Sequence, residues 1–256
     1  MLVLTREVVL PADALPLAAE LAGVSLPASL SPDVLWRDPE ADRAYRDAAV
    51  EAMADQGIWA RGGPNEAFVR TMTVLCRGAT ELAATVESGR DRRYQLLVAA
   101  SGKDAVLACH MPSTSTVVIR PARPDALADS LVRELPRVPP ADGPAVSVPE
   151  SVVQLAIDGG PARQDARLVL DIAALPRHGG GQITAGTRDG LGGRRTSGPD
   201  VCTYYDTARG RYLFSFSTAD GGERYVNVAP ARHETMVTRM HALLDNLTGQ
   251  SPAPLL

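Results

Sequence analysis

Histidine, glycine and arginine residues give this chain its few opportunities for chemistry. His233 and Glu234 begin like a helical zinc motif, but Val237 stands where the second histidine ligand is required. His241 lies eight residues after His233, about two helical turns away, so the two histidines can share one helix face. Two solvated histidines on an amphipathic helix are the simpler interpretation, and we expect no metal site.

The glycine-rich stretch 179–198 is the second candidate site. Residues 190–195 resemble a phosphate-binding loop in composition, but they lack the G-x-G-x-x-G spacing, and the only lysine, Lys103, lies in another turn. His178 directly precedes the stretch, with no serine or cysteine partner at a recognisable spacing. We therefore expect a mobile polar loop and no cofactor. An enzyme or anion-binding protein that uses this loop stays open as an alternative.

Nucleophilic catalysis finds no support elsewhere in the chain. The segment 23–27 contains a serine but lacks the second glycine of a nucleophile elbow. Cys76, Cys109 and Cys202 are odd in number and far apart, which supports neither a disulfide framework nor a zinc knuckle. We expect buried free thiols, no catalytic residues and a protein that is not an enzyme.

The overall charge of the chain argues against two classes of partner. The chain has 256 residues and a net charge of −4, without a block of like charges. Nucleic acid and anionic membranes both require a basic face, so neither is expected as the main partner. The N-terminus lacks the pattern of a signal peptide, and the longest uncharged run, 105–119, is too short to span a bilayer. We expect a soluble, cytoplasmic protein without stable membrane insertion.

A repeat 109 residues apart organises the chain. Segments 119–123 and 228–232 share one pattern, which is an apolar residue, a variable residue, proline, alanine and arginine. Each segment leads into a helical pattern. Apolar residues then fall at matching places, which are Leu127, Leu131 and Leu135 in the first copy and Met236, Met240 and Leu244 in the second. Both copies follow strand-like segments. The sequence therefore predicts a duplicated unit of several antiparallel strands followed by a helix.

The predicted elements follow the same order in both halves. In the first half we expect a strand over 4–10, helices over 11–21, from Pro39 to the terminus at Gly57 and over 64–77, strands over 81–87, 92–100, 105–110 and 116–120, and a helix over 124–135. In the second we expect helices over 149–157 and 161–175, strands over 182–188, 201–206, 211–217 and 223–229, and a helix over 232–247.

These elements predict an α+β fold with a central antiparallel sheet, and with helices at its ends or on one face. We expect a single domain over residues 1–256, made of two pseudo-repeats (about 1–135 and 150–248). Five prolines crowd into 136–149, which predicts a stiff, extended linker between the halves.

Aromatic residues gather in the last third of the chain. If residues 207–210 form a hairpin loop, Asp206 faces Arg211 and Tyr205 faces Tyr212. One sheet face then carries Val201, Thr203, Tyr205, Tyr212, Phe214 and Phe216. This face is either core beneath helices or, in part, an exposed platform for another protein, and both can hold because a sheet has two faces.

Several motifs in a fixed order resemble one protein family. They are the segments 23–30, 119–121, 181–183, 205–212 and 226–230, and they lie between Leu4 and the terminal helix at Leu247. The chain resembles the EspG proteins, which are cytosolic chaperones of type VII secretion in actinobacteria. The resemblance implies a duplicated body with a central sheet and two helical bundles, and a function in binding without catalysis.

The resemblance also implies the partner and the binding site. EspG proteins grip the hydrophobic tip of a helical PPE protein that is paired with a PE protein, using the sheet, the C-terminal helical half and the loop between the second and third strands. That loop maps to 88–91, which is short, and the chain has Arg224 and Tyr225 where the family often has tryptophan. Both departures predict a diverged helical cargo, and we expect a monomer or weak homodimer. The predicted partner-binding residues are Ser88, Gly89, Arg90, Tyr205, Arg211, Tyr212, Phe214, Phe216 and Tyr225. A regulatory binding domain of the same fold stays open as an alternative.

Overall fold

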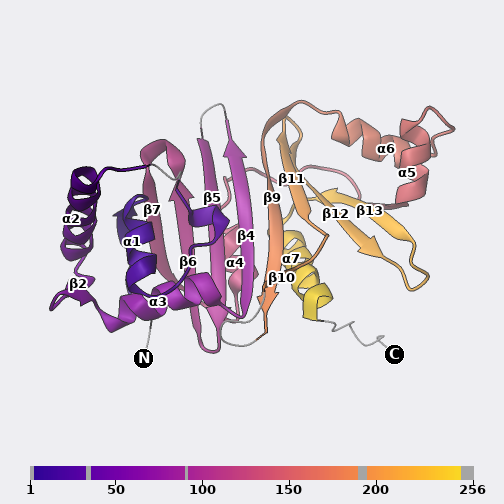
Figure 1. The fold of residues 1–256 in the computed structure, drawn as a ribbon. Coiled ribbons are helices and arrows are strands. Elements are labelled where there is room, and N and C mark those ends of the chain that lie inside the picture. Colours follow the sequence, from indigo (N-terminus) through magenta and orange to yellow (C-terminus); the bar gives the residue numbers. More distant parts are fainter. Residues whose placement is uncertain (1–2, 33–35, 90–91, 190–194, 249–256) are drawn as a thin grey trace.

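A large antiparallel sheet forms the centre of the molecule (Figure 1). The computed structural model describes residues 3–32, 36–89, 92–189 and 195–248. The first half contains β1 (Val8–Pro11), α1 (Ala14–Leu21), the 3-10 turn η1 (Ala28–Leu30), α2 (Pro39–Asp55), β2 (Trp59–Ala60), β3 (Gly63–Pro64), α3 (Glu66–Arg77), β4 (Thr80–Ser88), β5 (Arg92–Ser101), β6 (Asp104–Met111), the 3-10 turn η2 (Pro112–Thr114), β7 (Thr116–Ala122) and α4 (Leu127–Val132). The second contains β8 (Val146–Pro149), α5 (Glu150–Ile157), α6 (Gln164–Ala173), β9 (Arg177–Arg188), β10 (Arg195–Ser197), β11 (Cys202–Thr207), β12 (Gly210–Thr218), β13 (Arg224–Pro230) and α7 (His233–Thr248).

The predicted α+β class and each predicted helix and strand are confirmed, with shifted ends. The strand order is β1-β7-β6-β5-β4-β9-β11-β12-β13-β8, with β10 attached to β9. β4 and β9, the first long strands of the two halves, pair in the middle, and short strands β1 and β8 occupy corresponding edges. This order supports the proposal that 1–135 and 150–248 are pseudo-repeats around the β4–β9 seam. The proline-rich segment 136–149 does more than link them, because its last four residues form β8.

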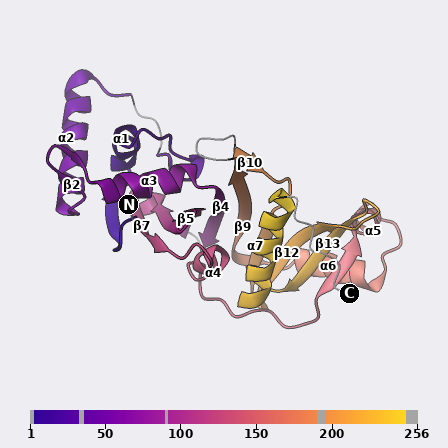
Figure 2. The ribbon, with the colours of Figure 1, turned by 90° about the horizontal axis from the view of Figure 1, so that it is seen from below.

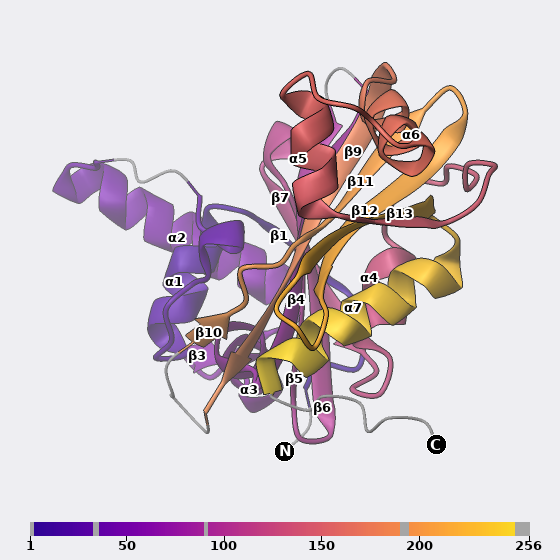
Figure 3. The same cartoon turned by 90° about the vertical axis from the view of Figure 1, so that its right-hand side faces the viewer.

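Helices lie on both faces of the sheet, which corrects the expectation of helices at its ends or on one face. On the front face, the side drawn toward the viewer in Figure 1, α1 and α3 cover Leu97, Val117 and Ile119. On the same face at the other end, α5 and α6 cover Tyr212 and Val228. The back face packs against α4 and α7 through a separate set of buried residues that includes Leu82, Tyr204, Leu213, Met236 and Met240. Figures 2 and 3 show α1 and α4 on opposite sides of the strands.

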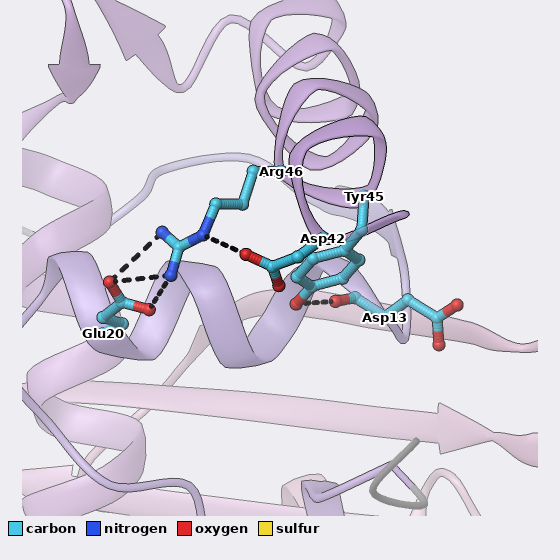
Figure 4. A network of polar contacts seen from close by, with 5 residues as sticks. All are labelled: Asp13, Glu20, Asp42, Tyr45 and Arg46. Atoms are coloured by element: carbon cyan, nitrogen blue, oxygen red, sulfur yellow. Dashed lines mark hydrogen bonds and ion pairs between the residues drawn. The ribbon is translucent and has the colours of Figure 1, made fainter. Parts of the chain in front are cut away.

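Polar contacts fasten α2 to the rest of the first half (Figure 4). The helix begins where the Asp38 carboxylate accepts hydrogen bonds from the amides of Glu40 and Ala41, and its only buried side chains are Ala49 and Met53. Arg46 pairs with Glu20 of α1 at 3.0 Å, and the Tyr45 hydroxyl donates to the Asp13 carbonyl at 2.7 Å. Exposed ion pairs of this kind contribute little stability, so α2 is a peripheral element.

The expected mobile loop at 179–198 is wrong for most of its length. Residues 179–188 belong to β9 and 195–197 to β10, while 190–194 lie outside the described residues. Glycine is required here for packing. A Cβ atom on Gly181 would lie 2.5 Å from the Thr85 carbonyl oxygen and 2.7 Å from the Tyr204 ring. The close approach of neighbouring groups at a central strand, and not loop formation, explains this part of the glycine run.

Gly210 holds the linker against the sheet, and we expect Gly210→Ala to destabilise the protein. Its φ of 102° and a Cβ that would lie 2.8 Å from the Pro139 carbonyl oxygen both disfavour a side chain. The positive φ costs about 1 kcal/mol, and overpacking adds about 1–3 kcal/mol. Gly222→Ala is the matched control, because Gly222 has a φ of 81° with nothing within 4 Å of its Cβ position. Urea unfolding measures both, and an equal loss of stability would show that the linker contact does not matter.

Candidate protein-binding surface

Among the described residues, no helix covers the middle of the front face. At one register across the sheet, Val117 lies beneath the N-terminal helices and Val228 beneath α5 and α6. Between them, Thr85, Gln182 and Thr203 pair side by side, and Gln182 is exposed while the two threonines are only half buried. We call the front-face residues of this region the central strip, which comprises Thr85, Glu87, Gly180, Gln182, Thr203, Tyr205 and Phe214. Figure 1 shows β4, β9 and β11 without a helix in front of their upper part.

The predicted aromatic hairpin is confirmed in its register. Tyr205 pairs with Tyr212 and Asp206 with Arg211, and the loop consists of the two residues between Thr207 and Gly210. The aromatic face divides into two parts. Tyr212 is 5% exposed and belongs to the core under α5 and α6. Tyr205, Phe214 and Phe216 are half exposed, so the core interpretation holds for Tyr212, while a platform for another protein at the other three stays a prediction.

The half-exposed aromatic rings are fixed by their neighbours. The rings of Tyr205 and Phe214 lie 5.0 Å apart with a tilt of 59°. Guanidinium groups lie over two of the rings, with Arg177 3.6 Å from the centre of Tyr205 and Arg224 4.2 Å from the centre of Phe216. Such contacts hold the rings in place before a partner arrives, which lowers the entropy lost on binding.

Two predicted site residues lie on the other face. Arg211 is 4% exposed, and its guanidinium donates to both Asp206 carboxylate oxygens, at 2.6 and 2.9 Å, and to the Pro136 carbonyl at 2.9 Å. Tyr225 pairs with Ser217 and therefore faces away from Phe216, and its hydroxyl donates to Glu223. Their placement makes Arg211 a structural residue and separates Tyr225 from the central strip. A role of either in partner binding stays a prediction.

The predicted loop residues lie at one end of the central strip. Ser88 ends β4 and pairs with Gly179, and the Gly89 amide donates to the His178 carbonyl at 3.1 Å. Arg90 lies outside the described residues. The structure thus brings Gly89 to the same surface as Tyr205, although they are far apart in sequence. Ser88 shares its register with Asp206 and therefore lies on the opposite face, so its role in partner binding stays a prediction.

A polar groove adjoins the aromatic rings, and sequence reasoning missed it. It has a volume of about 470 Å³ and is lined by Thr85, Glu87, Gly89, Arg93, Arg177, His178, Gly179, Gly180, Gly181, Gln182, Thr203 and Tyr205. We call it the glycine groove, because Gly180 places no side chain on this face. Alternation of polar and apolar residues from Gln182 to Ala185 was the signal in the sequence, since it is typical of a strand with one open face.

The three thiols differ in exposure, which predicts their reactivity. Burial raises the pKa of Cys76 and of Cys202 to about 12, and it also raises the pKa of the half-buried Cys109. At pH 8 only about one in ten thousand of the Cys76 and Cys202 thiols is then ionised. We expect a disulfide exchange reagent to modify at most Cys109 in the native protein, and all three thiols after unfolding in urea. Rapid modification of Cys202 in the native protein would contradict this.

Comparison with known proteins identifies the fold and its family. The model of the EspG family matches residues 11–242. The chain belongs to the EspG family. A solved structure that this EspG protein resembles is that of the Mycobacterium tuberculosis type VII secretion system chaperone EspG5 in complex with the PE25–PPE41 dimer. The two chains share 16% sequence identity with a TM-score of 0.71, over 94% of this chain and 97% of the other.

Among curated proteins none matches the chain. Within the described residues of this EspG protein, no helix combines the length and apolar character needed to cross a membrane.

Proposed function

We propose that this chain is a cytosolic specificity chaperone that binds helical substrates of a type VII secretion system and keeps them soluble. PE–PPE pairs or related helical proteins are the proposed substrates. The observation that carries the proposal is that the chain belongs to the EspG family. In its fold the central strip is exposed between two helical regions. EspG5, which shares this fold, is described in complex with a PE–PPE dimer.

The physical properties of the central strip suit this task. A chaperone must cover an apolar helical tip and later release it. Its binding surface therefore has to be rigid, and its exposed apolar patch has to be small. Tyr205 and Phe214 supply apolar contact area on paired strands, with Phe216 next to the strip on the same face, while Thr85 and Gln182 keep the neighbouring surface polar. Fixed aromatic side chains are the residues that most often dominate binding energy at protein interfaces.

Binding without catalysis is part of the proposal. Most of the glycine-rich stretch is strand, and Cys76 and Cys202 are buried, so neither feature supports the alternative of an enzyme. A net charge of −4 supports a protein partner over nucleic acid. We further propose that the protein is a monomer or weak homodimer, and that the short turn between β4 and β5 reflects a diverged cargo.

Co-expression tests the proposed function directly. The chain is expressed with each PE–PPE-like pair encoded near it, and the mixtures are analysed by size-exclusion chromatography with light scattering. We expect one pair to co-elute with the chain as a complex with one copy of each protein. A helical protein of similar size from an unrelated system serves as the control. Failure of every such pair to co-elute would contradict the proposal.

A further inference from the structure

The glycine groove carries a positive charge that no carboxylate of the described residues pairs. Among the groove residues, Arg93 pairs with Glu87 at 3.5 Å, and this accounts for the single carboxylate in the lining. Arg177 is exposed and forms no ion pair within the part of the chain that the structure describes. Its guanidinium lies over the Tyr205 ring and donates only a long bond, 3.3 Å, to the Ala173 carbonyl. The groove is thus locally cationic on a protein of net charge −4.

The floor of the glycine groove also offers unused hydrogen-bonding groups. Thr85, Gln182 and Thr203 lie side by side on β4, β9 and β11, with Gln182 exposed and the two threonines half buried. No hydrogen bond to another side chain or to the backbone engages these three side chains within the described residues. Because these side chains reach solvent, water can satisfy them, and they can bond to a partner from another molecule without breaking a hydrogen bond within the protein. Gly180, which pairs with Tyr205 beside this row, adds no side chain to the groove.

The C-terminal end of a helix presents hydrogen-bond acceptors that complement the donors of this groove. The last four carbonyls of a helix have no partner within it, and they carry a partial negative charge. Gln182, Thr85 and Thr203 can donate to such carbonyls, and a carboxylate beside them would pair with Arg177, whose planar group suits a bidentate contact. The N-terminal end of a helix presents N–H groups and a partial positive charge, which a cationic groove disfavours.

We propose that the glycine groove binds an acidic helix C-terminus at the tip of the secretion substrate, with Arg177 contacting the carboxylate of the substrate. This proposal rests on the proposed function and adds the chemistry that selects the substrate. The aromatic rings of the central strip cover the apolar part of the tip. The groove beside them distinguishes acidic tips from neutral or basic ones, because complementary charge contributes specificity more than affinity.

Charge reversal on the chaperone is the first arm of the test. Affinity is measured by calorimetry for the PE–PPE-like pair that co-elutes with the chain. We expect Arg177→Glu to weaken binding roughly tenfold or more, and the difference from the wild type to shrink as NaCl is raised. Arg43→Glu is the matched control, because Arg43 is an exposed residue on the peripheral α2 and the change in net charge is the same. Equal affinity of the two variants would overturn the inference and leave the proposed function intact.

A charge exchange with the substrate is the second arm. Acidic residues at the helical tip of the bound substrate are changed to lysine, which should weaken binding to the wild-type chain and restore binding to Arg177→Glu. If the lysine variants of the substrate bind the wild-type chain with unchanged affinity, no acidic group of the substrate contacts the groove, and the inference is wrong. If Arg177→Glu is weak but not rescued, Arg177 acts by positioning Tyr205, which also overturns the inference. If no pair binds the wild-type chain at all, the proposed function fails first.

Discussion

Arg211→Ala is expected to destabilise the fold by about 3–5 kcal/mol, since it leaves the buried Asp206 carboxylate without its partner. Asp206 is 5% exposed and Arg211 4%, and two hydrogen bonds of 2.6 and 2.9 Å join them. The same guanidinium holds the Pro136 carbonyl and lies 4.4 Å from the centre of the Tyr204 ring. A loss of this size is a large part of the total stability of a domain.

Two controls separate the buried charge from other effects of this substitution. Replacing both partners with apolar residues, Asp206→Leu with Arg211→Met, should recover most of the lost stability, because no unpaired charge remains. Arg123→Ala breaks a pair whose side chains are 76% and 64% exposed, and we expect little or no loss of stability, because solvent screens such a pair. Denaturant unfolding measures all three variants. Equal losses for Arg211→Ala and Arg123→Ala would show that burial of the pair does not matter.

Phe214→Asp is expected to weaken binding of the helical substrate by about a hundredfold or more. Phe214 lies in the central strip against Tyr205, and an aromatic residue at the centre of an interface commonly contributes about 2–4 kcal/mol. A carboxylate there also repels the acidic tip that we infer for the substrate. Calorimetry with the co-eluting PE–PPE-like pair measures the affinity, and thermal unfolding shows whether the variant is folded.

Tyr225→Asp is the matched control for this prediction. Tyr225 is also half exposed and aromatic, but it lies on the neighbouring strand β13 and on the opposite face of the sheet. If Tyr225→Asp weakens binding and Phe214→Asp does not, the substrate binds the back face and the assignment of the central strip is wrong. Should Phe214→Asp fail to fold, Tyr205→Ala removes contact area from the same strip without adding a charge. It should still weaken binding by about tenfold or more.

Local patterns were sufficient to predict the elements and one register. The spacing of apolar residues in the two terminal repeat helices placed α4 and α7, and the hairpin at 205–212 was predicted with the pairing that the structure has. These features depend on neighbours within a few residues. The prediction of a mobile loop at 179–198 failed because it considered only neighbours in sequence. The glycines of this stretch respond to Tyr204 and Thr85, which belong to other strands and leave no room for a Cβ on Gly181.

The sequence by itself determined the α+β class, the order of elements, the family and the alternation of the aromatic hairpin. Only the tertiary structure decided which face of that hairpin is open, because this depends on where α5, α6 and α7 pack. It also decided that Arg177 lies over Tyr205 while Arg211 is buried, although both are arginines beside aromatic residues. Exposure follows from the helices covering each part of the sheet, and those helices come from segments distant in sequence.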